Sequence, residues 1–137
     1  MVQPAKFANF LMAAILATGL VTGVSTGLSG CTKNAPENTN EILVGEFGSF
    51  TGGEATFGQS TSEGIKLAFL EQNKKGGVKG KQLKLITLDN QGKPEEARAA
   101  VQRLITKEKV IAVLGEVASS RTLAAAPVAQ QYKVPMI

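Results

Sequence analysis

From residue 42 onward, the chain of 137 residues alternates short apolar runs with longer segments of helical periodicity. The runs 42–47 and 110–115 are rich in β-branched and other large apolar residues, as expected for buried strands. Residues 81–88 carry apolar side chains on both faces of an extended segment, which predicts a strand covered on both sides. The run 134–137 predicts the opening of a fourth strand.

Helices are predicted between these strands. The first starts at Ser60, which has capping-box spacing with Glu63, or nearer Gly58, and reaches about Gln72. The second begins at Pro94, since proline is favoured in a first helical turn. Its apolar residues recur at i, i+3, i+4, i+7 and i+8, so that they share one face: Ala97, Ala100, Val101, Leu104 and Ile105.

A third helix is expected after the polar cluster 119–122, kinked or broken around Pro127. The order βαβαβαβ predicts an α/β fold, a doubly wound parallel sheet with right-handed crossovers. The sequence stops as the fourth strand begins, so we expect an N-terminal fragment with a sheet truncated in that strand.

The first 30 residues have the pattern of a secretory signal peptide: one charge, Lys6, precedes the apolar stretch 10–21, and small residues follow. The sequence Leu-Ser-Gly-Cys at 28–31 resembles the lipobox of bacterial lipoproteins, which implies a lipid on Cys31 and a mature protein that starts there. An ordinary signal peptide with a chance cysteine is the alternative. Residues 31–40 lack large apolar side chains and are expected to be a flexible tether.

Composition removes several functional classes. The chain has no His and one Cys, which excludes His-dependent catalytic triads, imidazole metal ligands and an internal disulfide. A net charge of +4 is small and scattered, so nucleic acid is not expected as a partner. Five lysines between residues 74 and 84 form either a solvated turn, which the sequence favours, or a patch for anionic lipid: Lys74, Lys75, Lys79, Lys81 and Lys84.

Candidate chemistry lies in the loops that follow the strands, because ligands of parallel sheets bind outside the carboxyl ends of the strands. The glycines of residues 45–53 have neither dinucleotide-binding nor P-loop spacing. Residues 117–122 precede a helix, where free N–H groups and serine hydroxyls suit a carboxylate. Ser119 or Ser120 is either part of such an anion site or merely a helix cap, and Phe57 is either a core residue or a ligand contact.

The run 42–137 resembles the first lobe of periplasmic substrate-binding proteins of the leucine/isoleucine/valine-binding type, which serve ABC importers. The resemblance is carried by motifs in a fixed order along the chain: Thr51-Gly52, Phe57-Gly58, residues 64–68, Asn73 with Gly76, Gly77 and Gly80, Asp89 with Pro94 and Ala97, Gly115 with Ser119, Ala126-Pro127 and residues 134–137.

This resemblance implies two lobes that close on a small ligand, a branched-chain or related amino acid, with no cofactor, metal or catalysis. It implies that Ser119 binds the ligand's carboxylate, that Val117 and Ala118 line the site, and that Phe57 packs on the ligand, with Ser120 as a further candidate. Phe57 stands where the family often has Tyr. Glu116 replaces the usual His or Pro, and a carboxylate so near an anion site is unexpected.

The resemblance also implies ABC-transporter permease subunits as partners and an extracytoplasmic location, with Cys31 holding the protein to a membrane. Residues 41–137 would then be a partial first lobe. Two other classes compete with this interpretation. A ligand-sensing domain of a receptor or regulator uses the same fold, and an extracytoplasmic enzyme with a flavodoxin-like core is disfavoured by the absence of His and of nucleotide loops.

Overall fold

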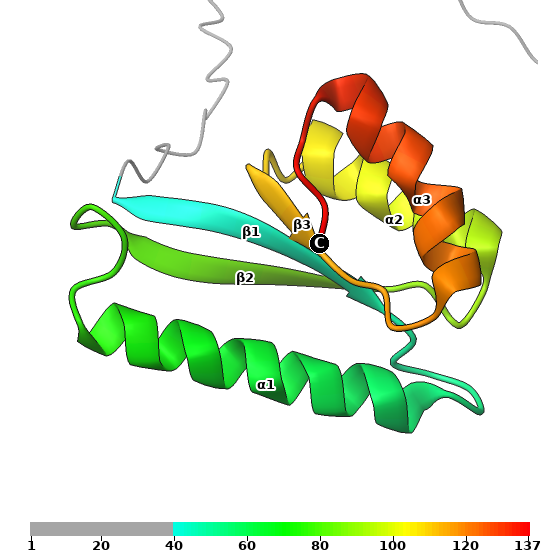
Figure 1. The fold of residues 1–137 in the computed structure, drawn as a ribbon, viewed down its shortest axis with the longest axis horizontal. Helices are drawn as coiled ribbons and strands as arrows, with labels where there is room; N and C mark the ends of the chain where they lie inside the picture. The colour runs from blue at the N-terminus through cyan, green and yellow to red at the C-terminus, as the bar shows by residue number, and fades with distance from the viewer. Residues whose placement is uncertain (1–39) are drawn as a thin grey trace, which may run out of the picture. The chain divides into compact units, whose positions relative to one another are not determined.

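The computed structural model describes residues 40–137, and the expected signal peptide, Cys31 and nearly all of the tether lie outside this range. The element order is β1 (Glu41–Gly48), α1 (Ala55–Lys74), β2 (Gln82–Asp89), α2 (Pro94–Thr106), β3 (Ala112–Leu114) and α3 (Ser119–Tyr132). The predicted βα alternation is therefore confirmed (Figure 1). No helix of residues 40–137 is long and apolar enough to cross a membrane.

The strands form a parallel sheet in the order β2-β1-β3. Strand β1 pairs with β2 from Glu41↔Gln82 to Gly48↔Asp89, so these two strands end at the same edge. A bridge between Val113 and Met136 shows that the chain after α3 begins to pair beyond β3, where the fourth strand was predicted.

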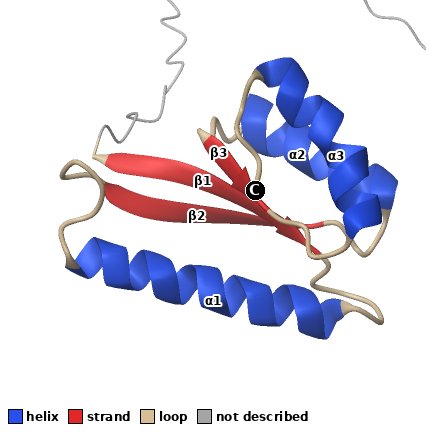
Figure 2. Cartoon of the chain, viewed as in Figure 1, coloured by secondary structure: helices blue, strands red, loops and turns tan. Residues whose placement is uncertain are grey.

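Helices lie on both faces of the sheet, as the doubly wound class requires (Figure 2). Successive residues of β1 show the two sides: a Cβ added to Gly45 would lie 2.9 Å from Leu104 of α2, whereas Glu46 accepts a hydrogen bond from Ser62 of α1. Helix α2 also packs against α3. The core therefore forms where β1 and β3 meet α2 and α3.

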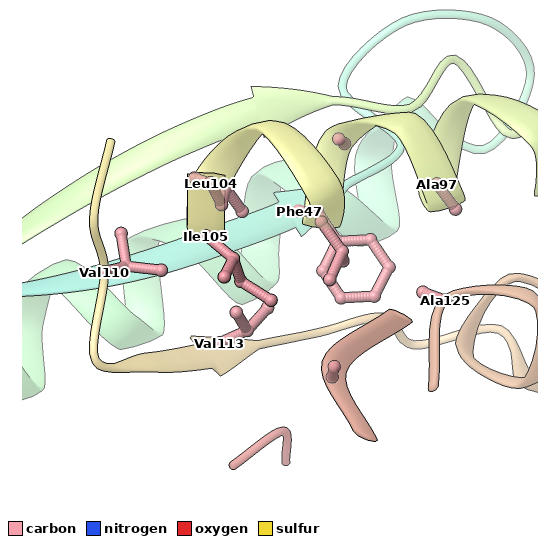
Figure 3. Packing of buried hydrophobic residues seen from close by; sticks show 10 residues of the cluster. Phe47, Ala97, Leu104, Ile105, Val110, Val113 and Ala125 are labelled. Carbon is pink, nitrogen blue, oxygen red and sulfur yellow. The ribbon is translucent and has the colours of Figure 1, made fainter. Parts of the chain in front are cut away.

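The predicted apolar stripe of α2 is buried in full, and it packs around Phe47 and Val113 (Figure 3). The buried cluster is completed by Val110, which precedes β3, and by Ala125 and Ala129 of α3. Because full burial of one large apolar side chain contributes about 1.5 to 3 kcal/mol, this layer dominates the stability of the described residues.

Three boundary predictions are wrong. Helix α1 starts at Ala55, ahead of Gly58 and Ser60, so Ser60 and Glu63 lie inside it and no side chain caps it. Of the two alternatives for Pro127, the break is wrong, because helix α3 continues through this residue to Tyr132. The third strand is shorter than residues 110–115, because only Ala112–Leu114 pair with β1.

Candidate functional site

A small cleft opens at the carboxyl edge of the sheet, between the start of α1 and the loop that joins β3 to α3. Its volume is about 160 Å³. It is lined by two residues from the start of α1 and four from the β3–α3 region: Glu54, Phe57, Glu116, Val117, Ala118 and Arg121. Three of the predicted site residues are thus brought together, although 60 residues separate Phe57 from Val117.

The predicted residues differ in how they meet this cleft. Phe57 and Val117 present apolar surface, since they are 65% and 57% exposed. The interpretation of Phe57 as a core residue is therefore wrong. Ser119 and Ser120 are exposed beside the cleft rather than among the residues that line it.

The start of α3 leaves polar groups available. Its N-cap is Ala118, and no side chain caps the helix, so the interpretation of Ser119 or Ser120 as the cap is wrong. The N–H groups of Ser119 and Ser120 have no partner within the helix, whereas that of Arg121 donates to the carbonyl of Ala118 at 3.1 Å. Within residues 40–137 the hydroxyls of Ser119 and Ser120 also form no hydrogen bond. Together with the helix dipole, these groups can bind an anion.

A polar network that sequence reasoning missed lies beneath this loop and joins the ends of all three strands. Asn90, fully buried after β2, donates from Nδ2 to Oε2 of Glu116 at 2.7 Å. The hydroxyl of Ser49, buried after β1, lies 3.0 Å from Oδ1 of Asn90 and 3.2 Å from Oε1 of Glu116. The β3–α3 loop is therefore attached to both neighbouring loops through one carboxylate.

Arg121 balances the charge of that carboxylate. Its Nε donates to Oε2 of Glu116 at 2.5 Å, Nη2 donates to Glu54, and Nη1 donates to the carbonyl of Gly92 at 3.3 Å. The hydrogen bond with Glu116 is the main reason why the pKa of Arg121 is raised, so the guanidinium stays charged. This pairing explains how a carboxylate at position 116 is tolerated near an anion site. The signal that could have revealed this pair was an acid and an arginine five positions apart, one before α3 and one in its first turn.

Asp89, at the end of β2, stabilises the loop that follows β1. It accepts hydrogen bonds from the hydroxyl of Thr51 at 2.7 Å, from N–H of Phe50 at 2.9 Å and from N–H of Gln91 at 2.8 Å. Burial acts to raise the pKa of Asp89, but these hydrogen bonds outweigh it and leave the pKa below its ordinary value. Asp89 is thus engaged in holding the loop between β1 and α1.

Glycine 58 sets how closely α1 approaches this loop. A Cβ at this buried position would lie 2.1 Å from the carbonyl oxygen of Ser49, so only glycine lets the helix start here. That close approach places Phe57 at the cleft. Within residues 40–137, no group of His, Cys, Asp and Glu side chains is arranged to hold a metal ion.

Comparison with known proteins agrees with this architecture. Residues 41–137 match the model of the periplasmic binding protein family. The chain belongs to this family. An amino acid binding protein of Pseudomonas aeruginosa is 35% identical over 88 residues, which cover 64% of this chain and 24% of that protein.

Two solved structures of transporter substrate-binding proteins are similar to this chain in fold and sequence. A branched-chain amino acid transporter substrate-binding protein of Streptococcus pneumoniae, in complex with isoleucine, has a TM-score of 0.68 and 34% identity, over 70% of this chain and 28% of that one. A solute-binding protein of Rhodopseudomonas palustris, in complex with 3,4-dihydroxybenzoic acid, has a TM-score of 0.63 and 35% identity, over 71% and 26%. The chain spans about a quarter of the length of these proteins.

Proposed function

We propose that this chain belongs to the solute-binding component of an ABC importer and forms part of the first of two lobes that close on a small carboxylate ligand. The ligand we favour is a branched-chain or related amino acid. The protein would be exported, held to a membrane on its extracytoplasmic side by a lipid on Cys31, and would deliver its ligand to the permease subunits. Membership of the periplasmic binding protein family supports this proposal.

The observation that carries the proposal is the start of α3. Unpaired N–H groups and the hydroxyls of Ser119 and Ser120 stand beside the cleft, where they would hold a carboxylate through charge-assisted hydrogen bonds. The similar protein from Streptococcus pneumoniae is in complex with isoleucine, and the one from Rhodopseudomonas palustris is in complex with 3,4-dihydroxybenzoic acid. Both ligands carry a carboxylate. A shared carboxylate site accounts for ligands that differ in every other part.

The apolar surfaces would select the rest of the ligand. Phe57 and Val117 both line the cleft, one from α1 and one from the β3–α3 loop, and both are more than half exposed. A ligand side chain between them would bury apolar area from both, at roughly 25 cal/mol per Å². Phenylalanine offers no hydroxyl, so this contact would favour aliphatic or aromatic groups over polar ones.

Substitution of Ser119 tests this assignment in the complete protein. Loss of a hydrogen bond to a charged group costs about 1.5 to 3 kcal/mol, so Ser119→Ala should weaken isoleucine binding by roughly 10- to 100-fold in a calorimetric titration. Ser60→Ala, which changes an exposed serine on α1, is the control and should bind like wild type. Normal binding by Ser119→Ala with a lower unfolding midpoint would show that Ser119 acts only in folding.

A second substitution separates the two halves of the proposed site. Phe57→Ala should weaken isoleucine more than alanine or glycine, because only the larger ligand reaches the aromatic ring. Ser119→Ala should weaken all three by a similar factor, because they share the carboxylate. A uniform loss for both variants would contradict the division of roles between Phe57 and Ser119.

A further inference from the structure

The lysines of the described residues gather at one edge of the sheet. In a parallel sheet, each turn from a helix into the next strand lies at the amino edge, opposite the loops that form the cleft. Turns of this kind follow α1, α2 and α3. Of the ten lysines in residues 40–137, eight lie in these turns or at the helix and strand ends beside them, and we name this set the lysine edge: Lys74, Lys75, Lys79, Lys81, Lys84, Lys107, Lys109 and Lys133.

The charge of the lysine edge is largely unbalanced. All eight side chains belong to exposed residues. Lys84 pairs with Glu41 at 3.1 Å, and Glu108, the acid between Lys107 and Lys109, pairs with Arg103 at 3.3 Å. The other seven lysines form no ion pair with any acidic side chain of residues 40–137. Several positive charges therefore face solvent together.

Helix dipoles explain only part of this distribution. A lysine in or next to the last turn of a helix is favoured by the negative end of the dipole, which accounts for Lys74, Lys107 and Lys133. The effect fades beyond that turn. Lys79 and Lys81 lie five or more residues past the end of α1, so their presence at this edge has another cause.

The chain enters the domain at this same edge. The carbonyl of Asn40 accepts a hydrogen bond from N–H of Gln82, the first residue of β2, at 3.0 Å. Cys31 precedes Asn40 by nine residues, which span at most about 30 Å when fully extended. A lipid on Cys31 would therefore hold the lysine edge close to the membrane surface, with the cleft at the opposite edge.

We propose that the lysine edge docks on an anionic phospholipid surface. The recognised chemistry is the phosphate of acidic head groups. Surface lysines near such a membrane are attracted over about one Debye length, roughly 8 Å at physiological salt, and the short tether would keep the edge close to that range. The proposal goes beyond the binding of a ligand in the cleft. It depends on the proposed anchor only for the orientation of the domain at the membrane, because charge alone governs the binding of protein without a lipid to vesicles.

Vesicle sedimentation of the complete mature protein with Cys31→Ser, which carries no lipid, tests the proposal. We expect binding to vesicles of phosphatidylcholine with phosphatidylglycerol, little binding to phosphatidylcholine alone, and a steep loss of binding as salt rises. The variant Lys75→Gln/Lys81→Gln/Lys107→Gln should bind about a hundredfold more weakly, because each lysine near the surface contributes roughly fivefold.

A matched control removes three basic charges away from the lysine edge. Lys66→Gln/Lys93→Gln/Arg98→Gln lowers the net charge equally and should weaken vesicle binding by less than about threefold, while both triple variants keep wild-type isoleucine affinity. Equal weakening by the two triple variants would overturn the proposal, because binding would then follow net charge alone. Equal binding of the Cys31→Ser protein without further substitutions to neutral and anionic vesicles would overturn it as well. Neither result depends on whether isoleucine binds.

Discussion

Replacement of Arg121 by methionine should destabilise the protein through the carboxylate that it leaves behind. The side chain of Arg121 is 9% exposed and that of Glu116 is 4% exposed. Methionine fills much of the arginine volume but cannot neutralise Glu116, so the variant keeps a buried charge without its cation. Removal of one member of a buried ion pair typically costs about 3 to 5 kcal/mol.

The structure indicates that the loss of unfolding free energy in Arg121→Met lies near the lower end of that range. Asn90 and Ser49 still face the oxygens of Glu116 in the variant, which retains part of its stabilisation. Glu54, the second partner of Arg121, is 54% exposed and becomes hydrated when the guanidinium is lost. We therefore expect Arg121→Met to lower the free energy of unfolding by about 3 kcal/mol.

A second substitution separates the effect of the unpaired charge from that of lost packing. Glu116→Gln keeps an acceptor for Asn90 while it removes the charge, so Arg121→Met/Glu116→Gln should be only about 1 kcal/mol less stable than wild type. Urea denaturation of the complete protein, monitored by circular dichroism, gives the free energy of unfolding of both variants. Arg98→Met, at an exposed position of α2, is the control and should change the stability by less than about 0.5 kcal/mol.

Two results would refute this reasoning. If Arg121→Met cost no more than Arg98→Met, the buried ion pair would not contribute to folding. If the double variant were as unstable as Arg121→Met, the loss would come from packing of the arginine rather than from the unpaired charge of Glu116. Isoleucine affinity is expected to fall in Arg121→Met and to recover in the double variant, since an unbalanced Glu116 repels a carboxylate nearby.

Three further predictions concern the backbone, acid stability and the anchor. Gly58→Ala should destabilise the protein by about 2 kcal/mol or more, because the Cβ of alanine would collide with Ser49 and outweigh its better helix propensity. Gly64→Ala, with open space around it, should stabilise the protein by about 0.5 to 1 kcal/mol in the same urea assay. Equal effects of the two substitutions would contradict the close approach of Gly58 to Ser49. Because the pKa of Asp89 is lowered in the folded state, its carboxylate stabilises the fold fully above the ordinary pKa of 3.8, and this stabilisation is lost as pH falls through the folded pKa. In urea titrations, the stability advantage of wild type over Asp89→Asn should therefore shrink below about pH 4. A larger advantage at low pH would contradict the lowered pKa. If Cys31 is acylated, the precursor should partition with bacterial membranes and Cys31→Ser should be released or left uncleaved; a soluble wild-type protein with an intact thiol would refute the anchor.

The sequence alone determined the class of fold and the position of the loops that matter. Local patterns suffice for this purpose, because the periodicity of apolar residues reflects which face of a helix or strand is buried. The stripe of α2 was predicted residue by residue, and all five of its members are buried. The parallel order then indicated that the loops after Phe47, Leu88 and Gly115 meet at one edge.

Helix boundaries were less well predicted, because the rules for them rest on local capping. Helix α1 starts at Ala55 without a side-chain cap, and α3 starts after Ala118 although two serines follow at once. In the first case the close approach of Gly58 to Ser49 sets the position of the helix, which is a tertiary contact. That contact, and not the predicted Ser60–Glu63 cap, sets where the helix begins.

Only the tertiary structure decided which polar residues share an environment. Ser49 and Glu116 are 67 positions apart, and no local pattern connects them; they meet because three parallel strands end side by side. In the sequence Arg121 is one of several polar residues near the start of α3, and only the fold shows that it is buried and bonded to two carboxylates. The lysine edge has the same origin, because the turns that carry its charges are separate in sequence and are gathered by the parallel sheet.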